Sequence, residues 1–170
     1  MGNVRLRYKP PAGLSQALPR LPRPAVCESE TTRCTPGAPD SMILRASLFV
    51  ESISSKIKSQ ELKSEDVVKF FLDKIKNYNK DLNAIVSLRD ETEIISEAKE
   101  KDRLFDNGNK IGLLHGMPLA IKDITDVKEL PTSFGCKEYK NNFPDEDSII
   151  SERLKKAGAI IIGKTNTAEL

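Results

Sequence analysis

The chain has 170 residues, with 27 basic and 25 acidic side chains, a length that suits about one domain. Its first 41 residues hold six of the basic and three of the acidic side chains, so the remainder is close to neutral. Nucleic-acid-binding domains usually carry a clustered basic face, so we expect no direct nucleic-acid partner. There is no apolar run of about 18 residues, so we also expect no membrane span.

Residues 1–41 hold seven of the ten prolines and show no periodic pattern. Proline fixes φ and removes a backbone donor, so this segment predicts a disordered, proline-rich tail, and we assign residues 42–170 to the folded part. An organelle transit peptide is the alternative, but its amphipathic helix would be interrupted by the prolines. Three cysteines without a paired framework favour a reducing compartment, and we predict a cytoplasmic location.

The first clear element is a helix from Ser64 to about Tyr78. A capping hydroxyl at Ser64, followed by two acids, favours a helix start. Its apolar face has the spacing of an amphipathic helix: Val68, Phe71, Leu72 and Ile75. A short strand over residues 82–86 and a second helix over residues 91–105, ended by Asn107-Gly108, come next.

The second half of the folded part alternates strand and helix patterns. Residues 118–124 predict a buried strand, and Asp147 or Ser148 begins a third helix that runs to Ala157. We expect this helix to turn three residues inward: Ile150, Leu154 and Ala157. Residues 159–162 are apolar on both faces, as in the centre of a covered sheet. The alternation indicates α/β architecture.

Lys122 is the one lysine inside the otherwise apolar, strand-like stretch of residues 112–124. Alternation in a strand places Ala120, Lys122 and Ile124 on one face, which is apolar enough to be covered. A buried lysine loses its solvation, and its neutral amine can then act as a base. The other interpretations are an ion pair with Asp123, which alternation makes awkward, and exposure at a sheet edge.

Residues 158–165 match the phosphate-binding pattern G-x-x-x-x-G-K-[ST] in every position. The four variable positions are Ala-Ile-Ile-Ile, however, which favour a strand and disfavour a loop. The preceding residues predict a helix where the motif requires a strand. We therefore do not expect nucleotide binding.

The single histidine, His115, precedes the strand of residues 118–124 in a predicted turn, so we expect it to be structural. One histidine and no CxxC pair make no zinc set, and we expect no metal and no cofactor. The serines at positions 133, 148 and 151 fall in a turn and at a helix start, where caps and loop residues are usual.

Four ordered motifs carry a resemblance to a known family. They are Gly112-Leu-Leu-His-Gly-Met-Pro-Leu-Ala-Ile-Lys-Asp123, Leu130-Pro-Thr-Ser-Phe-Gly135, Pro144-Asp-Glu-Asp-Ser148 and Arg153-Leu-Lys-Lys-Ala-Gly-Ala-Ile-Ile-Ile-Gly-Lys-Thr-Asn166. Together with the preceding helix they resemble the amidase signature family over residues 53–170. The resemblance implies a mixed β-sheet covered by helices on both faces, here its N-terminal portion and therefore incomplete.

The same resemblance implies hydrolysis of amide carbon–nitrogen bonds by a Ser–cis-Ser–Lys triad, with Lys122 as the catalytic lysine. The two serines and the oxyanion loop of the family lie beyond Asn166, in a segment that this chain lacks. We therefore expect the 170 residues to be inactive alone, with a small amide as substrate once the site is complete. The A subunit of the glutamyl-tRNA amidotransferase and a non-catalytic, truncated isoform or binding fragment are the alternatives, and the oligomeric state stays open.

Overall fold

The computed structural model describes residues 49–109 and 111–169. The predicted tail of residues 1–41, its boundary at Met42 and the transit-peptide alternative all lie outside the described residues. The division of the chain at residue 42 therefore stays a prediction.

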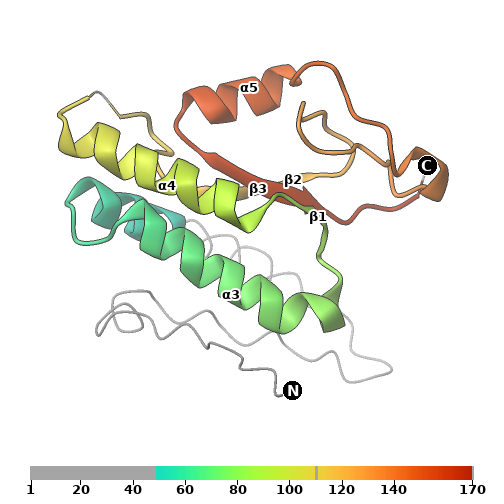
Figure 1. Ribbon diagram of the computed structural model, residues 1–170, viewed down its shortest axis with the longest axis horizontal. Helices are drawn as coiled ribbons and strands as arrows, with labels where there is room; N and C mark the ends of the chain where they lie inside the picture. The colour runs from blue at the N-terminus through green and yellow to red at the C-terminus, as the bar shows by residue number, and fades with distance from the viewer. Residues whose placement is uncertain (1–48, 110, 170) are drawn as a thin grey trace, which may run out of the picture.

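The described part alternates helices with three short strands. A helix through residues 49–58 precedes α3 (Ser64–Leu82), β1 (Ile85–Leu88) and α4 (Glu91–Asp106). Next come β2 (Pro118–Lys122), a 3-10 helix (Lys137–Tyr139), α5 (Ile149–Lys156) and β3 (Ile160–Thr165). The sheet order is β1-β3-β2, with β1 antiparallel and β2 parallel to β3. In Figure 1, α3 and α4 lie on one side of this sheet and α5 on the other. The predicted mixed sheet with helices on both faces is confirmed.

Each face of the sheet has its own apolar core. The core under α3 and α4 contains Val68, Leu72, Ile94, Ala98, Ile160 and Ile162. The core under α5 contains Ile121, Val127, Leu130 and Ile161, with Leu154 of α5 packed against it. Burying each of the valine, leucine and isoleucine side chains contributes roughly 1.5–3 kcal/mol, so the two layers hold β3 in the centre of the sheet.

A β-bulge interrupts the pairing of β2 with β3. Leu119 pairs with Ile161, but the next residue, Ala120, pairs with Gly163, so Ile162 is an extra residue in β3. Gly163 is needed here, because a Cβ atom at this position would lie 2.3 Å from the carbonyl oxygen of Ser87 in β1. The bulge thus changes which side chains of β3 face each core.

Two helices begin and end close to where the sequence predicts. The carboxylate of Asp90 caps α4 by accepting hydrogen bonds from the backbone N–H groups of Thr92 and Glu93, at 2.9 and 3.2 Å. Ser148 caps α5 by accepting from the N–H of Ser151 at 3.2 Å. Both caps are local in sequence, which is why the two starting points were predictable.

The predicted cap of α3 is wrong. Ser64 is the first helical residue, and its hydroxyl, fully buried, has no hydrogen-bond partner among the described residues. The carboxylate of Asp102 in α4 instead accepts from the N–H groups of Ser64 and Glu65, at 2.7 and 3.0 Å. The cap is thus supplied across 38 residues of sequence.

Two further expectations need correction. Leu82 belongs to the end of α3 and is 68% exposed, and the strand runs over residues 85–88 instead of 82–86. Ile150 is 61% exposed, whereas Ser151 is the buried residue of α5. In α5 the inward position is taken by a serine because its hydroxyl donates to the carbonyl of Asp126, at 2.6 Å.

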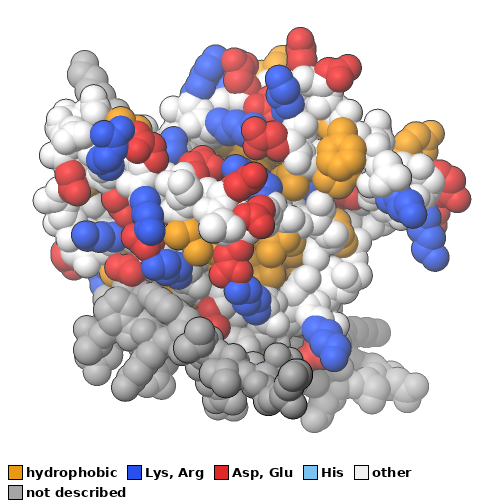
Figure 2. Space-filling view, in the orientation of Figure 1, with side chains coloured by type: hydrophobic (Ala, Val, Ile, Leu, Met, Phe, Trp, Pro, Cys, Tyr) orange, Lys and Arg blue, Asp and Glu red, His pale blue; other side chains and the backbone are white. Residues whose placement is uncertain are grey.

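Basic and acidic side chains are interspersed over the face shown in Figure 2. Several form ion pairs along a helix, such as Lys69 with Glu65 and Lys156 with Glu152. Among the described helices, none has the length and hydropathy that a membrane span requires.

Candidate active site

Lys122, the predicted catalytic residue, is the last residue of β2. It lies beside Thr165, its partner in the parallel register with β3. Its side chain is exposed, and among the described residues it has no ion-pair or hydrogen-bond partner. The expectation that this lysine is buried is therefore wrong for the described part of the chain.

Strand alternation explains the exposure of Lys122. Ile121 is turned into the core under α5 and is 7% exposed, so Lys122 lies on the opposite face. The cover provided by α3 and α4 on that face includes Ala120 but not Lys122. The strand ends at Lys122 and not at Ile124 as predicted, and Ile124 lies in the following turn, where it is 47% exposed. The apolar pattern predicted the face correctly but not how far its cover extends.

Asp123 is buried beside this exposed lysine and holds the following turn. Its N–H donates to the carbonyl of Thr165 at 3.1 Å, and its side chain is 2% exposed. Its carboxylate accepts from the N–H of Ser133, at 3.0 Å, and from the Ser133 hydroxyl. The proposed ion pair of Lys122 with Asp123 is absent from the described structure, because this carboxylate is directed to Ser133 instead.

The turn held by Asp123 has two residues in the left-handed region. Phe134 has φ 53° and Gly135 has φ 71°, and the N–H of Phe134 donates to the carbonyl of Asp123 at 3.0 Å. A left-handed phenylalanine is uncommon and persists where surrounding contacts fix it. The backbone of Gly135 also lies close to Ala168, since a Cβ atom there would be 2.9 Å from the Ala168 carbonyl oxygen. Residues 133–135 and the end of the described chain thus meet near the carboxyl ends of β2 and β3.

The buried lysine of this region is Lys164, which the sequence pointed to only as part of a rejected phosphate-binding pattern. β3 covers residues 160–165 and so extends beyond the strand predicted over residues 159–162, and the Lys164 side chain is 0% exposed. Its amine donates to the carbonyl of Thr125 and to the hydroxyl of Thr132, the latter at 3.0 Å. Burial lowers the pKa of the Lys164 amine, although the carboxylates of Asp123 and Asp126 act to raise it.

His115 and the three serines make hydrogen bonds within the fold. The buried His115 ring places Nε2 3.1 Å from the carbonyl oxygen of Lys101, and burial lowers the pKa of the imidazole. Ser133 is bonded to Asp123, and the hydroxyls of Ser148 and Ser151 lie 2.9 Å apart at the start of α5. These contacts agree with the predicted turn and cap positions.

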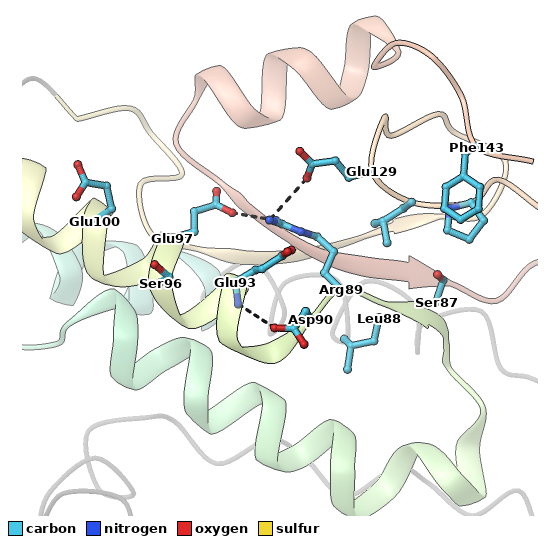
Figure 3. Close-up of a pocket in the computed structure, with 12 residues that line it drawn as sticks. Ser87, Leu88, Arg89, Asp90, Glu93, Ser96, Glu97, Glu100, Glu129 and Phe143 are labelled. Atoms are coloured by element: carbon cyan, nitrogen blue, oxygen red, sulfur yellow. Dashed lines mark hydrogen bonds and ion pairs between the residues drawn. The ribbon is translucent and has the colours of Figure 1, made fainter. Parts of the chain in front are cut away.

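A surface depression of about 1030 Å³ lies along β1, at the opposite edge of the described sheet from β2. Figure 3 shows the Arg89 side chain within it, between Glu97 and Glu129. The guanidinium donates to Glu97 and to the carbonyl of Ile161, both at 2.9 Å, and lies 3.7 Å from Glu129. Arg89 thus connects Glu97 of α4 and Glu129 to β3. Lys122 is not among the residues that line this depression.

One group of described side chains brings potential metal ligands together. The sulfur of Cys136 and carboxylate oxygens of Glu138 and Glu169 all lie within 4.8 Å of one another. The Cys136 thiol donates to Glu138 at 2.7 Å, and this hydrogen bond raises the pKa of the thiol. Metals bind the thiolate, so this contact disfavours the ligand form. The sequence did not predict this grouping, because Glu169 is 33 positions after Cys136.

The fold and these positions define an open α/β protein with an exposed lysine amine at the carboxyl ends of two parallel strands, which is where such sheets usually bind ligands. The chain matches the family model described as Amidase over residues 66–170. It is 34% identical over 122 residues to an acylamidase from Rhodococcus erythropolis, covering 72% of this chain and 25% of that protein. Over the same length it is 38% identical to an A subunit of glutamyl-tRNA(Gln) amidotransferase from Clostridium acetobutylicum, with 72% and 25% covered.

Solved structures give the same result. The native peptide amidase from Stenotrophomonas maltophilia is similar with a TM-score of 0.65 and 32% identity, over 71% of this chain and 25% of that one. The chain therefore belongs to the amidase signature family, as its motifs predicted. It spans about a quarter of the length of the curated relatives it matches.

Proposed function

We propose that this chain supplies the lysine of a Ser–cis-Ser–Lys amidase site, with Lys122 as the general base for hydrolysis of a small amide. The observation that supports this role most directly is the position of its amine. It is free of described side-chain partners at the carboxyl ends of β2 and β3, so other groups can approach it. Membership in the amidase family supplies the class of reaction.

In the proposed reaction Lys122 accepts a proton through a bridging serine, which activates a second serine to attack the amide carbonyl. The amine leaves with a proton, and water hydrolyses the acyl-enzyme while backbone N–H groups stabilise the oxyanion. An amine acts as a base only in its neutral form, which is favoured when water is excluded from around it. The proposal therefore requires further protein to cover the exposed Lys122.

We also propose that the 170 residues do not turn over amides alone. The serines near the site are committed to other contacts, with Ser133 bonded to Asp123 and Ser151 bonded to Asp126. Neither is placed as a serine that relays a proton to Lys122. In this proposal the chain forms the N-terminal portion of an amidase domain. We also propose a cytoplasmic location, which the number of cysteines supports.

A hybrid enzyme tests the proposal. The 122 aligned residues of this chain replace the corresponding stretch of the Rhodococcus erythropolis acylamidase, and turnover of benzamide is measured. Replacing Lys122 by Met should lower kcat about 10³-fold, because general-base catalysis contributes about 10²–10⁴-fold. Lys128→Met is the matched control, since Lys128 is also exposed and lies six residues further on. A Lys122→Met hybrid that retains the rate of its parent contradicts the proposal.

The second candidate is glutamine hydrolysis as part of an amidotransferase. The identity to the Clostridium acetobutylicum protein, 38%, is slightly above the 34% to the acylamidase, so identity does not favour hydrolysis of a small amide over hydrolysis of glutamine. Placing the same 122 residues in the Clostridium acetobutylicum protein and comparing glutamine with benzamide separates the two. Turnover of glutamine without turnover of benzamide supports the amidotransferase. Lack of turnover in both hybrids, with both folded, supports the non-catalytic fragment.

A further inference from the structure

Lys164 is a buried charged group that the proposed proton transfer does not use. Its side chain is 0% exposed, although an ammonium loses favourable hydration when it is buried. Such a residue is retained only where hydrogen bonds compensate that loss. The hydrogen-bond partners of Lys164 therefore indicate its role.

The β-bulge decides which contacts Lys164 can make. In a regular strand it would share a face with Ile160 and Ile162, which belong to the core under α3 and α4. Because Ile162 is an extra residue, Lys164 instead pairs with Ile121, a member of the core under α5. Its amine thereby reaches the loop that joins β2 to the 3-10 helix.

The amine joins two points of this loop, seven residues apart. It donates to the carbonyl of Thr125, near the beginning of the loop, and to the hydroxyl of the fully buried Thr132. Next to Thr132 is Ser133, whose N–H and hydroxyl are held by Asp123. The two sets of contacts fix both ends of the segment that follows Lys122.

We propose that Lys164 is a positioning residue for the site at Lys122: it fastens residues 125–132 to β3 and so keeps the Asp123–Ser133 contact in place beside the reactive amine. The catalytic meaning of this position rests on the proposed function, whereas the fastening itself does not. Lys164 acts through Thr125 and Thr132 and does not touch the substrate.

Hydrogen exchange of the full 170-residue chain, followed by mass spectrometry, tests the fastening without any substrate. In Lys164→Met, amides in residues 123–136 should exchange about tenfold faster, while those of α3 and α4 change less than about twofold, because local opening is separate from global unfolding. Thr132→Val replaces the hydroxyl by a methyl group of similar size and should accelerate exchange in the same residues. Thr132→Ser keeps a hydroxyl and should restore most of the protection.

Lys128→Met is the control, since this lysine lies in the same loop with its side chain exposed. Unchanged exchange in Lys164→Met and Thr132→Val overturns the proposal, and so does acceleration spread evenly over α3 and α4. Should Lys164→Met fail to fold, the Thr132→Val and Thr132→Ser pair decides by the same criteria. Lys122→Met should leave exchange unchanged, so a failure of the proposed catalysis is distinguishable from a failure of the fastening.

Discussion

Two lysines lie near the carboxyl ends of adjacent strands in opposite environments. Lys122 ends β2 with its side chain exposed, and Lys164 lies inside β3 with none of its side chain exposed. Both follow apolar residues in the sequence, yet only Lys164 is buried. The buried lysine donates to loop groups that need a partner, whereas the amine of Lys122 is open to approach. In our proposals the buried Lys164 has a structural role, and the exposed Lys122 is the base once further protein covers it.

The largest expected effect comes from adding a side chain at Gly163, where β3 lies close to β1. Gly163→Val places a Cβ atom where only 2.3 Å separates it from the Ser87 carbonyl oxygen. We expect the free energy of unfolding in urea to fall by about 3 kcal/mol, the upper end of typical overpacking costs. Gly108→Asn is the control, because no atom lies within 4 Å of a Cβ there and asparagine tolerates positive φ. Near-native stability of Gly163→Val would show that the close approach of β3 to β1 does not require a glycine here.

Much of the fold could be predicted from local patterns. The helix expected over residues 91–105 is α4, Glu91–Asp106, because its apolar spacing and the Asn107-Gly108 stop are both local signals. The apolar residues 159–162 predicted a buried strand, and β3 begins at Ile160. These features depend on residues close together in sequence.

The features that could not be predicted depend on distant contacts. The cap of α3 comes from Asp102, and the burial of Lys164 depends on Thr125 and Thr132 together with the bulge at Ile162. For Lys122, alternation predicted the correct face, but the cover of that face depends on where α3 and α4 lie. The role of Lys122 itself stays a prediction, carried by its motif and its position.

A smaller effect, on the pH dependence of stability, is expected near the amino end of β2. His115 is buried there, whereas Lys122 at the carboxyl end is exposed. Burial lowers the pKa of His115 from its ordinary 6.5, so below that pH the unfolded chain binds more protons than the folded chain. Above pH 6.5 the imidazole is neutral in both states and does not affect stability. Below pH 6.5 the free energy of unfolding falls as the pH falls, because protonation favours the unfolded chain. Urea unfolding between pH 7.5 and 5 should show this loss in the parent chain and less of it in His115→Gln. Parallel pH curves for the two proteins would contradict the assignment.

The central claim is that Lys122 has a chemical role and Lys164 a structural one. The direct measurement compares Lys122→Met with Lys164→Met in the acylamidase hybrid, recording benzamide turnover and thermal unfolding together. We predict that Lys122→Met lowers kcat about 10³-fold with an unchanged unfolding temperature. Lys164→Met should lower the unfolding temperature and, below it, retain kcat within about tenfold. A hybrid that loses turnover with Lys164→Met but keeps it with Lys122→Met would contradict the account.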